Sequence, residues 1–397
     1  MVFADRSFKS GSLEIKASYQ PMRTDFENGI LTVFNRYDFT NFSEYEFTYS
    51  VKVDGRAIKT EKISIDLAPH SKTEIRIDIP NIECKYGATL NCELKKECDI
   101  VAHTQHQLPV NIIKEPQEKP AKLFEDEQNI VFSGYNFSYT FSKHYGMFSS
   151  IKTNGIERIS GRPRLTVWRP PTDNDRLNMQ GRWRDTVCFD NVFTKVYNCE
   201  YKDDTIIVNG SLAGVSRIPF CKFILKVTVD ANGKIDFILE ANINEEGDPL
   251  PRFGFEWELP STSSEFTYYG SGPMESYNDL DHASSVDIYS STASKEYVNY
   301  VRPQEHGNHN KTKMLTIGGL VFTAEDLMEF NVSNYSSKTL TDALHTDELK
   351  SDGKIHLRTD YRSYGLGSAS CGPGPSIEHI FNEKHIDFKF SVKPELK

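Results

Sequence analysis

Two neighbouring stretches decide the fold class: Phe223-Ile224-Leu225-Lys226-Val227-Thr228-Val229 and Lys234-Ile235-Asp236-Phe237-Ile238-Leu239. Both are rich in β-branched and aromatic residues, and polar residues recur between the apolar ones at a spacing of two. That spacing is typical of a strand with one buried face. The same pattern occurs at residues 136–141 and 387–392, whereas helical periodicity is scarce, with one short turn expected from Thr339 to Leu344. The sequence therefore predicts an all-β protein.

The N-terminal part of the chain carries its own set of short strands. Apolar and polar side chains alternate at residues 30–34, 45–51 and 73–79, and Asp54-Gly55 is a hairpin turn signal. About seven short strands in roughly 100 residues fit an immunoglobulin-like sandwich. The Cys–Trp–Cys signature of antibody domains is absent from this part of the sequence, so the prediction concerns the architecture only.

Residues 113–122 form a charged segment with two prolines, which can neither pack nor continue a strand easily. We interpret this segment as a linker between a first domain at residues 13–112 and a second at residues 123–397. Since no second linker follows, one large, many-stranded sandwich is the simplest architecture for the second domain. We expect two β domains, preceded by a short segment at residues 1–12.

Composition and charge exclude several classes of protein. The chain has 397 residues, of which 12% are aromatic, and its formal net charge of −10 argues against a nucleic-acid partner. No stretch approaches the ~18 apolar residues of a membrane span, so we expect no membrane partner. The N-terminus lacks an apolar signal region, which predicts a cytoplasmic location if Met1 is the native start. Seven cysteines at irregular spacings favour reduced thiols over a metal site at Cys84, Cys92 and Cys98.

Four polar segments, here called loop strings, are punctuated by proline and glycine: residues 168–175, 270–279, 300–308 and 365–373. Proline and glycine fix turns, so the side chains between them lie on ordered loops. In the first loop string, Asp173 and Asn174 could accept hydrogen bonds from sugar hydroxyls or hold a cation. The residues favour the alternative, in which both side chains bond their own backbone and Trp168 is buried.

The second loop string contains two carboxylates, Glu275 and Asp279. They could pair as general acid and base, because glycosidases use two carboxylates that flank the scissile bond. Spacing along a loop does not establish a separation in space, however, and any acidic loop offers such pairs. The catalytic interpretation is therefore the weaker one.

The third loop string contains Glu305 and His306, with His309 close behind. A glutamate beside two histidines invites a zinc hypothesis or a proton-transfer hypothesis. Gly307 lies between the histidines and indicates a turn rather than a helix. We favour a surface loop that touches the sheet edge.

The fourth loop string places Cys371 among small residues. A nucleophilic cysteine needs a base and a depressed pKa, and no such partner is evident nearby in the sequence. A tight loop that reaches towards another element is the better description. Taken alone, these residues indicate a large β protein with polar loops.

Together, the loop strings resemble the C-terminal part of the large microbial β-galactosidases of glycoside hydrolase family 2. Residues 168–175 and 300–305 are specific to the fifth domain of that family. Further segments continue in register with that domain: residues 333–340, His345 and residues 360–362.

The resemblance extends over essentially the whole chain. Residues 3–6 and 19–22 are similar to the exit from the family's catalytic barrel, which makes residues 1–12 a remnant of that exit. Residues 13–112 resemble the fourth domain, an immunoglobulin-like sandwich. Residues 123–397 resemble the fifth, a large β-supersandwich related to galactose mutarotases.

The resemblance implies a function for the complete enzyme. Two glutamates of a catalytic barrel hydrolyse terminal β-D-galactosides, such as lactose, with retained stereochemistry. Both glutamates, and the magnesium and sodium of the enzyme, belong to a barrel that would precede residue 1. We therefore expect no catalytic residue, metal site or cofactor in this chain. It would be a non-catalytic C-terminal part or a separately encoded small subunit, inactive alone. The expected partners are the barrel-containing part and the galactoside, in an oligomer.

The resemblance also implies a substrate-proximal loop, residues 368–373, that closes one wall of the active site near the leaving-group sugar. Its central residues are Ser370, Cys371 and Gly372. Cys371 stands where some members carry a tryptophan, so strong stacking on the leaving-group sugar is not expected. Leu280 is a second departure, because the family string usually continues with arginine there.

Two alternatives from other classes remain open. A free-standing carbohydrate-binding module would use a candidate sugar-binding face on the large domain: Trp168, Asp173, Asn174, Glu275, Arg302, Glu305 and His306. A mutarotase-like aldose epimerase would use Glu305 or Glu275 with His306 for proton transfer.

Overall fold

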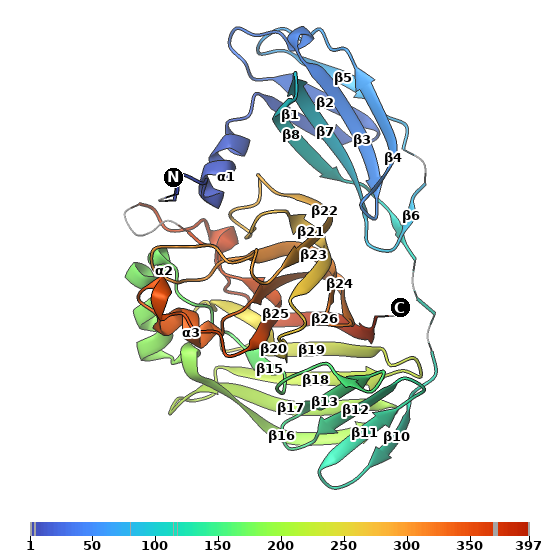
Figure 1. The fold of residues 1–397 in the computed structure, drawn as a ribbon, viewed down its shortest axis with the longest axis vertical. Coiled ribbons are helices and arrows are strands. Elements are labelled where there is room, and N and C mark those ends of the chain that lie inside the picture. Colours follow the sequence, from blue (N-terminus) through green and yellow to red (C-terminus); the bar gives the residue numbers. More distant parts are fainter. Residues whose placement is uncertain are drawn as a thin grey trace. The chain divides into compact units, whose positions relative to one another are not determined.

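The computed structural model describes residues 2–3, 5–79, 81–113, 115–116, 118–367 and 372–395. The chain divides into two compact units (Figure 1): unit 1 comprises Met1–Pro116 with Asp281–Ile288, and unit 2 comprises Gln117–Leu280 with Tyr289–Lys397. Strands dominate both units, so the all-β prediction is confirmed. The domain boundaries drawn from the sequence stay predictions, and none of them anticipates the grouping of Asp281–Ile288 with unit 1. Within the described part of the chain, no helix has the length and apolar character needed to span a membrane.

Unit 1 contains two antiparallel sheets and a helix, α1 (Ser10–Ser18). The helix was not predicted, and it buries none of its residues, which explains why the sequence shows no apolar period there. One sheet consists of β1 (Met22–Glu27), β2 (Ile30–Asn35) and β5 (Lys72–Arg76). The other has the order β4 (Arg56–Ile63), β3 (Glu46–Val53), β7 (Ala88–Lys96) and β8 (Asp99–Gln107). The short strands β6 (Glu83–Cys84) and β9 (Asn111–Ile112) pair in parallel, and Phe42–Glu44 forms the 3-10 turn η1.

A shared apolar core joins the two larger sheets of unit 1. Leu31 of β2, Phe47 of β3 and Leu90 of β7 are buried in it. Asp54 and Gly55 connect β3 to β4 with φ angles of 48° and 76°, the left-handed conformation that a two-residue hairpin turn requires. The predicted sandwich architecture and hairpin turn are therefore confirmed.

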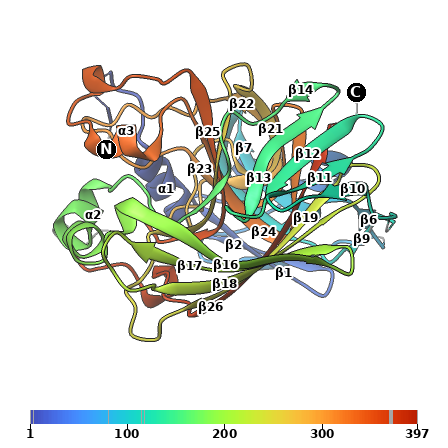
Figure 2. The same cartoon turned by 90° about the horizontal axis from the view of Figure 1, so that it is seen from below.

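Unit 2 contains a five-stranded and a twelve-stranded antiparallel sheet (Figure 2). The five-stranded sheet has the order β10 (Lys122–Glu125), β11 (Asn129–Ser133), β12 (Phe137–Ser142), β13 (Met147–Thr153) and β14 (Ile156–Glu157). The main path of the larger sheet is β15 (Arg164–Thr166), β20 (Arg252–Pro260), β25 (Lys354–Ser363), β24 (Leu320–Ser333), β26 (His385–Pro394), β19 (Ile235–Ile243), β18 (Cys221–Val229), β17 (Thr205–Gly214) and β16 (Val192–Lys202). Off this path, β21 (Glu265–Gly272) pairs with β22 (Ser285–Thr292) and β23 (Asn308–Ile317), and β23 also pairs with β24.

Short helical segments connect the strands of unit 2. They are α2 (Asp173–Asn178), η2 (Gly181–Thr186), η3 (Phe189–Asn191), α3 (Ser337–Asp342), η4 (Thr346–Glu348) and η5 (Ile377–His379). The turn expected from Thr339 to Leu344 is part of α3.

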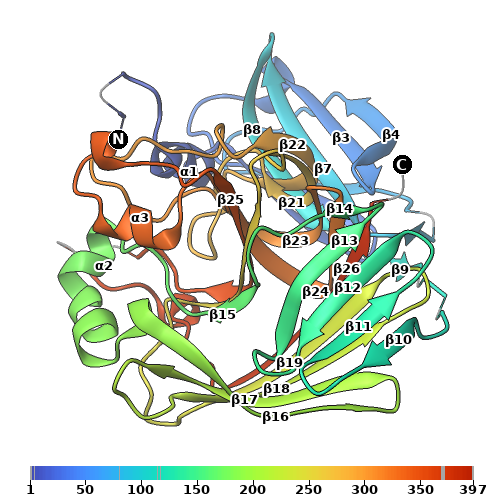
Figure 3. The same cartoon turned by 60° about the horizontal axis from the view of Figure 1, so that its bottom comes forward.

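The five-stranded sheet packs over the β16–β19 part of the larger sheet (Figure 3). The rings of Phe148 and Phe237 meet across this interface with centroids 6.1 Å apart, and Phe237 stacks on Phe390 at 4.8 Å. Along β19, buried side chains alternate with more exposed ones, which confirms the predicted period of two. The apolar core of unit 2 is therefore a sheet-on-sheet sandwich.

Candidate functional site

Antiparallel pairing brings the first and fourth loop strings to one end of the large sheet. Thr166, at the end of β15, pairs with Gly254 of β20. Ser363, at the end of β25, pairs with Arg252, the first residue of β20. The first loop string therefore leaves the sheet on one side of the start of β20, and the fourth loop string leaves it on the other side. The helix α2, which begins inside the first loop string, lies at this end of unit 2 near α3 (Figures 2 and 3).

The second and third loop strings join the same region through backbone bonds. Ser276 N donates to Asn308 O at 2.7 Å. Glu275 accepts from the Tyr300 hydroxyl at 2.9 Å and from Gly307 N at 2.9 Å. We call the region where the four loop strings meet the loop junction.

The first loop string contacts the third along its length. Glu305 N donates to Pro170 O at 3.0 Å, and Asp173 N donates to Gln304 Oε1 at 3.0 Å. Arg176, in the last turn of α2, donates to Pro303 O at 2.7 Å. The junction is thus held by main-chain groups and by side chains that reach main-chain groups.

Arg169 is the central side chain of the first loop string. It is buried and forms a two-pronged pair with Asp175, with Nε–Oδ2 at 3.1 Å and Nη2–Oδ1 at 2.9 Å. Its remaining donors bond Tyr364 O and, at 3.0 Å, Gly365 O in the chain that follows β25. Burial by itself lowers the pKa of Arg169, but the charge of Asp175 and its hydrogen bonds more than offset this effect, so the guanidinium stays charged.

The position of the Asp175 side chain is set by the start of the helix α2. Thr172 is the N-cap, and its hydroxyl accepts from Asp175 N at 3.2 Å while Asp175 Oδ2 accepts from Thr172 N at 3.0 Å. This reciprocal capping box fixes the carboxylate in the orientation that Arg169 uses.

Two further side chains reach the start of the fourth loop string. The two oxygens of Asp279 accept from Leu366 N at 2.9 Å and from Gly367 N at 2.8 Å. Asn174 Nδ2 donates to Leu366 O at 3.1 Å and to Gly367 O. A cavity of about 310 Å³ adjoins these groups and is lined by Asp279, Leu280, Leu366, Gly367, Pro375, Ser376 and His379.

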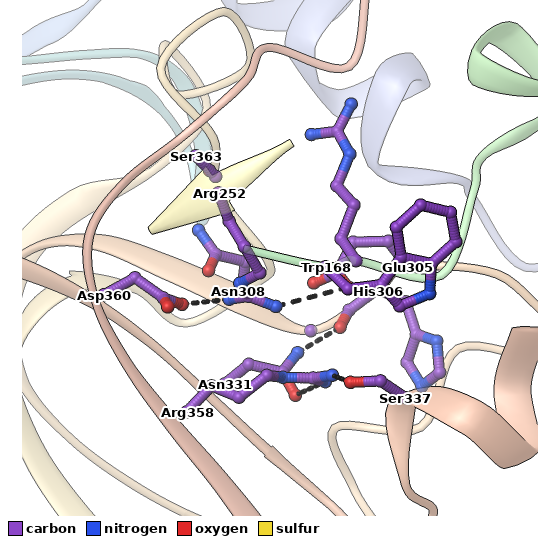
Figure 4. Close-up of polar contacts among 12 residues, drawn as sticks. Trp168, Arg252, Glu305, His306, Asn308, Asn331, Ser337, Arg358, Asp360 and Ser363 are labelled. Atoms are coloured by element: carbon purple, nitrogen blue, oxygen red, sulfur yellow. Dashed lines mark hydrogen bonds and ion pairs between the residues drawn. The ribbon is translucent and has the colours of Figure 1, made fainter. Parts of the chain in front are cut away.

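A buried charged cluster adjoins the third loop string (Figure 4). Arg252 forms ion pairs with Asp360 and, at 3.6 Å between Nη1 and Oε2, with Glu305. Burial by itself lowers the pKa of Arg252, but the carboxylates of Asp360 and Glu305 outweigh it and raise this pKa. The cluster therefore holds a permanent positive charge between two acidic side chains inside the protein.

A second arginine ties α3 and β24 to the third loop string (Figure 4). Arg358 donates to Ser337 Oγ at 2.5 Å and to Asn331 Oδ1 at 2.5 Å. Asn331 Nδ2 in turn donates to His306 O. Each of these side chains is buried, so their polar atoms depend on one another for hydrogen bonds.

Glu329 of β24 is a buried carboxyl group whose pKa is raised. Its Oε2 accepts from Asn308 Nδ2 at 3.0 Å and from Ser363 Oγ at 2.5 Å. Burial raises the pKa of Glu329 more than the bond from Ser363 lowers it, and the nearby Asp360 adds to the increase.

The residues of the candidate sugar-binding face are largely inside the protein. Trp168, Glu275, Glu305 and His306 are buried, Asn174 and Arg302 are half-buried, and Asp173 is exposed. Trp168 Nε1 donates to Thr341 Oγ1 at 3.0 Å, and the predicted burial of Trp168 is confirmed. Of the substrate-proximal loop, Gly372 is exposed, while Ser370 and Cys371 lie outside the described residues.

Two local interpretations of the sequence are wrong. Glu305 and His306 do not lie on a surface loop, because they are only 3% and 4% exposed, packed between the first loop string and β24 residues. Asp173 and Asn174 do not bond their own backbone. Asp173 pairs with Arg176 at 2.7 Å and Asn174 reaches the fourth loop string, because Thr172 and Asp175 form the capping box of α2.

The carboxylates and histidines of the second and third loop strings bind separate partners. Glu275 bonds Gly307 N, whereas Asp279 bonds the fourth loop string. His306 Nδ1 lies 2.7 Å from Gln304 O, and His309 Nε2 lies 3.0 Å from Glu296 Oε2. Across the described ranges, no three His, Cys, Asp or Glu side chains gather as a metal-binding group.

No role was predicted for four residues that hold the junction together: Arg169, Asp175, Arg252 and Arg358. One signal was present. Arg169 stands between Trp168 and Pro170, and Arg252 stands between Pro251 and Phe253. An arginine flanked by apolar residues is rarely buried without a partner, so such a position predicts a buried ion pair. The partner itself cannot be read from the neighbouring residues.

Two family models match this chain. The model for the β-galactosidase small chain matches residues 133–392, and the model for domain 4 of β-galactosidase matches residues 31–109. An aldose epimerase homologue from C. elegans aligns with 65% of this chain and 95% of its own at 8% identity. Its TM-score of 0.35 is too low to support an argument.

Curated relatives carry the same name. The β-galactosidase of Actinobacillus pleuropneumoniae is 27% identical over 99% of this chain and 40% of its own length. That of Lactobacillus delbrueckii subsp. bulgaricus is 30% identical over 88% of this chain and 36% of its own length. The chain thus spans about two fifths of the length of these relatives. Since the small-chain model matches more than half of its residues, this chain belongs to the β-galactosidase small-chain family.

Proposed function

We propose that this chain is the non-catalytic part, or a separately encoded small subunit, of a family 2 β-galactosidase that hydrolyses terminal β-D-galactosides such as lactose. Its role is to supply the wall loop, residues 368–373, and a surface for assembly with a barrel-containing part. The wall orients the leaving-group sugar and excludes water at the shallow end of the barrel. We also propose a cytoplasmic location and assembly into an oligomer.

One observation carries the proposal. The chain that leads into the wall loop is held by three side chains, Arg169, Asn174 and Asp279, through bonds to its main-chain groups. A loop that must orient a ligand needs a base that does not move, and this base stands on a rigid β scaffold. The names of the relatives support the choice of reaction.

The two rival functions receive less support. An aldose epimerase needs an accessible acid and base, but Glu305 and His306 are buried and bonded to protein atoms. A carbohydrate-binding module on the same face would need Trp168 as an open stacking platform, and that ring is buried as well. The magnesium and sodium of the complete enzyme are assigned to the barrel and to no residue described here.

The test measures hydrolysis of a chromogenic β-galactoside by the purified chain alone, and then by the chain mixed with the barrel-containing part. We expect no turnover alone and turnover on mixing, with the heat-unfolded chain as the control for the mixture. Turnover by the chain alone, after removal of host galactosidase, would overturn the non-catalytic role. Saturable galactose binding without any activity on mixing would favour the binding module instead.

The wall role has a separate test in the assembled enzyme. Replacing residues 368–371 by four glycines should leave assembly intact and lower kcat/KM by about ten- to a hundredfold, because the leaving group is less well oriented. Replacing an exposed residue of a distant turn, such as Asn232 beside Gly233, serves as the control. An unchanged kcat/KM in the glycine variant would remove the wall role from the proposal.

A further inference from the structure

The four residues that precede the wall loop, Tyr364–Gly367 and here called the stem, belong to no strand or helix. Every main-chain N–H and C=O of the stem nevertheless has a partner outside it. Tyr364 N donates to Pro251 O at 2.9 Å and Gly365 N to His379 O at 2.9 Å. The remaining six groups bond three side chains, Arg169, Asn174 and Asp279. An irregular segment with complete external bonding has one preferred path.

The last two residues of the stem, Leu366 and Gly367, are hydrogen-bonded by two different side chains. Asp279 accepts hydrogen bonds from the N–H groups of Leu366 and Gly367. Asn174 donates hydrogen bonds to the carbonyl oxygens of the same two residues. Each side chain suits its task, because a carboxylate only accepts hydrogen bonds whereas a carboxamide NH2 group donates two. The hydrogen bonds that Asp279 accepts are stronger than those that Asn174 donates, since a carboxylate acceptor strengthens a hydrogen bond.

The glycines of the stem are required by this arrangement. A Cβ atom at Gly365 would lie 2.7 Å from Asp279 Oδ2 and 3.1 Å from His379 Cβ. Gly367 has a φ angle of 61°, which side chains other than glycine rarely adopt. The two glycines therefore allow the main chain of the stem to lie close to the Asp279 side chain.

Packing holds only the first half of the stem, where Tyr364 is buried in the apolar core of unit 2 and its ring centroid lies 5.4 Å from that of Trp183. Leu366 and Gly367 are only half-buried, and they line the cavity of about 310 Å³ that also borders Asp279. The position of Leu366 and Gly367 therefore depends more on their hydrogen bonds to Asp279 and Asn174 than on burial.

We propose that Asp279 and Asn174 are positioning residues of the stem: together they fix the main chain of Leu366 and Gly367, the residues from which the wall loop continues. Neither side chain touches substrate in this proposal, and neither is an acid, a base or a sugar ligand. The kinetic consequence rests on the proposed function of the wall loop, whereas the hold on the stem can be measured in this chain alone.

The first measurement is hydrogen exchange of the full chain, read at the amides of Leu366 and Gly367. Asp279→Asn places an NH2 group, or a weaker neutral acceptor, against these amides, so both should exchange at least about tenfold faster. Asn174→Ala should accelerate them by a smaller factor, since it removes only the carbonyl partners. The control is Asp126→Asn, because Asp126 also accepts two backbone bonds, each 2.7 Å long, from Gln128 and Asn129 in an exposed turn. Unchanged exchange in both junction variants would overturn the inference.

The second measurement is steady-state kinetics of the assembled enzyme with the same variants. Asp279→Asn should lower kcat/KM by about tenfold at unchanged assembly, and Asp126→Asn should leave it unchanged. Faster amide exchange with unchanged kinetics would keep the hold on the stem and overturn the wall role on which this step rests. If Asp279→Asn fails to fold, Asn174→Ala supplies both measurements.

Discussion

Unit 2 contains two regions of opposite chemistry: the sandwich core and the loop junction. The sandwich core is held by apolar contacts such as Phe237 against Phe390, whose rings are almost parallel at an interplanar angle of 6°. The loop junction is held by buried charges such as Arg169 with Asp175. Apolar contacts have no preferred direction, whereas a guanidinium pair depends on geometry. The first region secures the fold, and the second secures the path of the loops.

This contrast suits the proposed function. A wall loop of this sequence, Ser-Ala-Ser-Cys-Gly-Pro, cannot form its own apolar core, because its residues are small. Its base must then be positioned by hydrogen bonds from a neighbouring element. The junction supplies them at the cost of burying several charges, each of which needs a partner.

The largest effect is expected where a buried charge loses its partner. Arg169→Met removes the charged partner of Asp175 and the donor to Tyr364 O and Gly365 O, and should lower the free energy of unfolding by about 3–5 kcal/mol. Urea unfolding followed by tryptophan fluorescence measures it, since the Trp183 ring lies 5.7 Å from the Arg169 guanidinium. The control is Arg184→Met, because Arg184 is 42% exposed in its pair with Asp190 and should contribute less than about 1 kcal/mol. Equal costs for the two variants would contradict the role of Arg169.

A smaller, pH-dependent effect is expected at Glu329. The folded-state pKa of Glu329 is raised above its usual value of 4.5, so the stability it contributes is present below that pH and is lost as the pH rises towards the folded-state pKa. Glu329→Gln cannot ionise and escapes this loss. Its stability relative to the unmodified chain should therefore increase by up to about 1.4 kcal/mol per pH unit over that window.

Thermal or urea unfolding of both proteins between about pH 3 and pH 8 tests this expectation. Glu348→Gln is the control of opposite sign. The backbone N–H of Leu344 lowers the pKa of the exposed Glu348, so this variant should lose a little stability at neutral pH and none at low pH. A difference between Glu329→Gln and the unmodified chain that does not vary with pH would mean that Glu329 is ionised in the folded protein.

The smallest effect is expected in the sandwich core. Leu239 is fully buried, and Leu239→Met conserves its volume and apolar character, so it should cost less than about 1.5 kcal/mol. The same replacement residue thus gives a large loss at position 169 and a small one at position 239. If Leu239→Met lowers the free energy of unfolding as much as Arg169→Met does, the contrast between the sandwich core and the loop junction does not hold.

Much of the fold could be predicted because its signals are local. The alternation in residues 234–239 is a property of one strand, and β19 has the expected alternating burial. The turn at Asp54-Gly55 depends on two residues only. The helix α1 was not predicted, because it buries none of its side chains and therefore leaves no apolar period in the sequence.

The candidate site could be predicted only in part. The sequence pointed to the correct loop strings, but it assigned Glu305 and His306 to the surface, because proline- and glycine-rich segments usually lie there. Their burial follows from contacts with Pro170 and Asn331, which are distant in sequence. Asp279 was considered as an acid or base, whereas its bonds give it a structural task.

The sequence by itself determined the all-β class and the positions of the loop strings, since strand periodicity and turn residues act over a few neighbouring positions. Only the tertiary structure decided which loop string meets which. Asp279 and Gly367 are 88 positions apart, and Arg252 and Asp360 are 108 apart. Such pairs form because antiparallel strands bring distant loops to one end of a sheet. Strand order and register depend on the whole chain and not on any one segment.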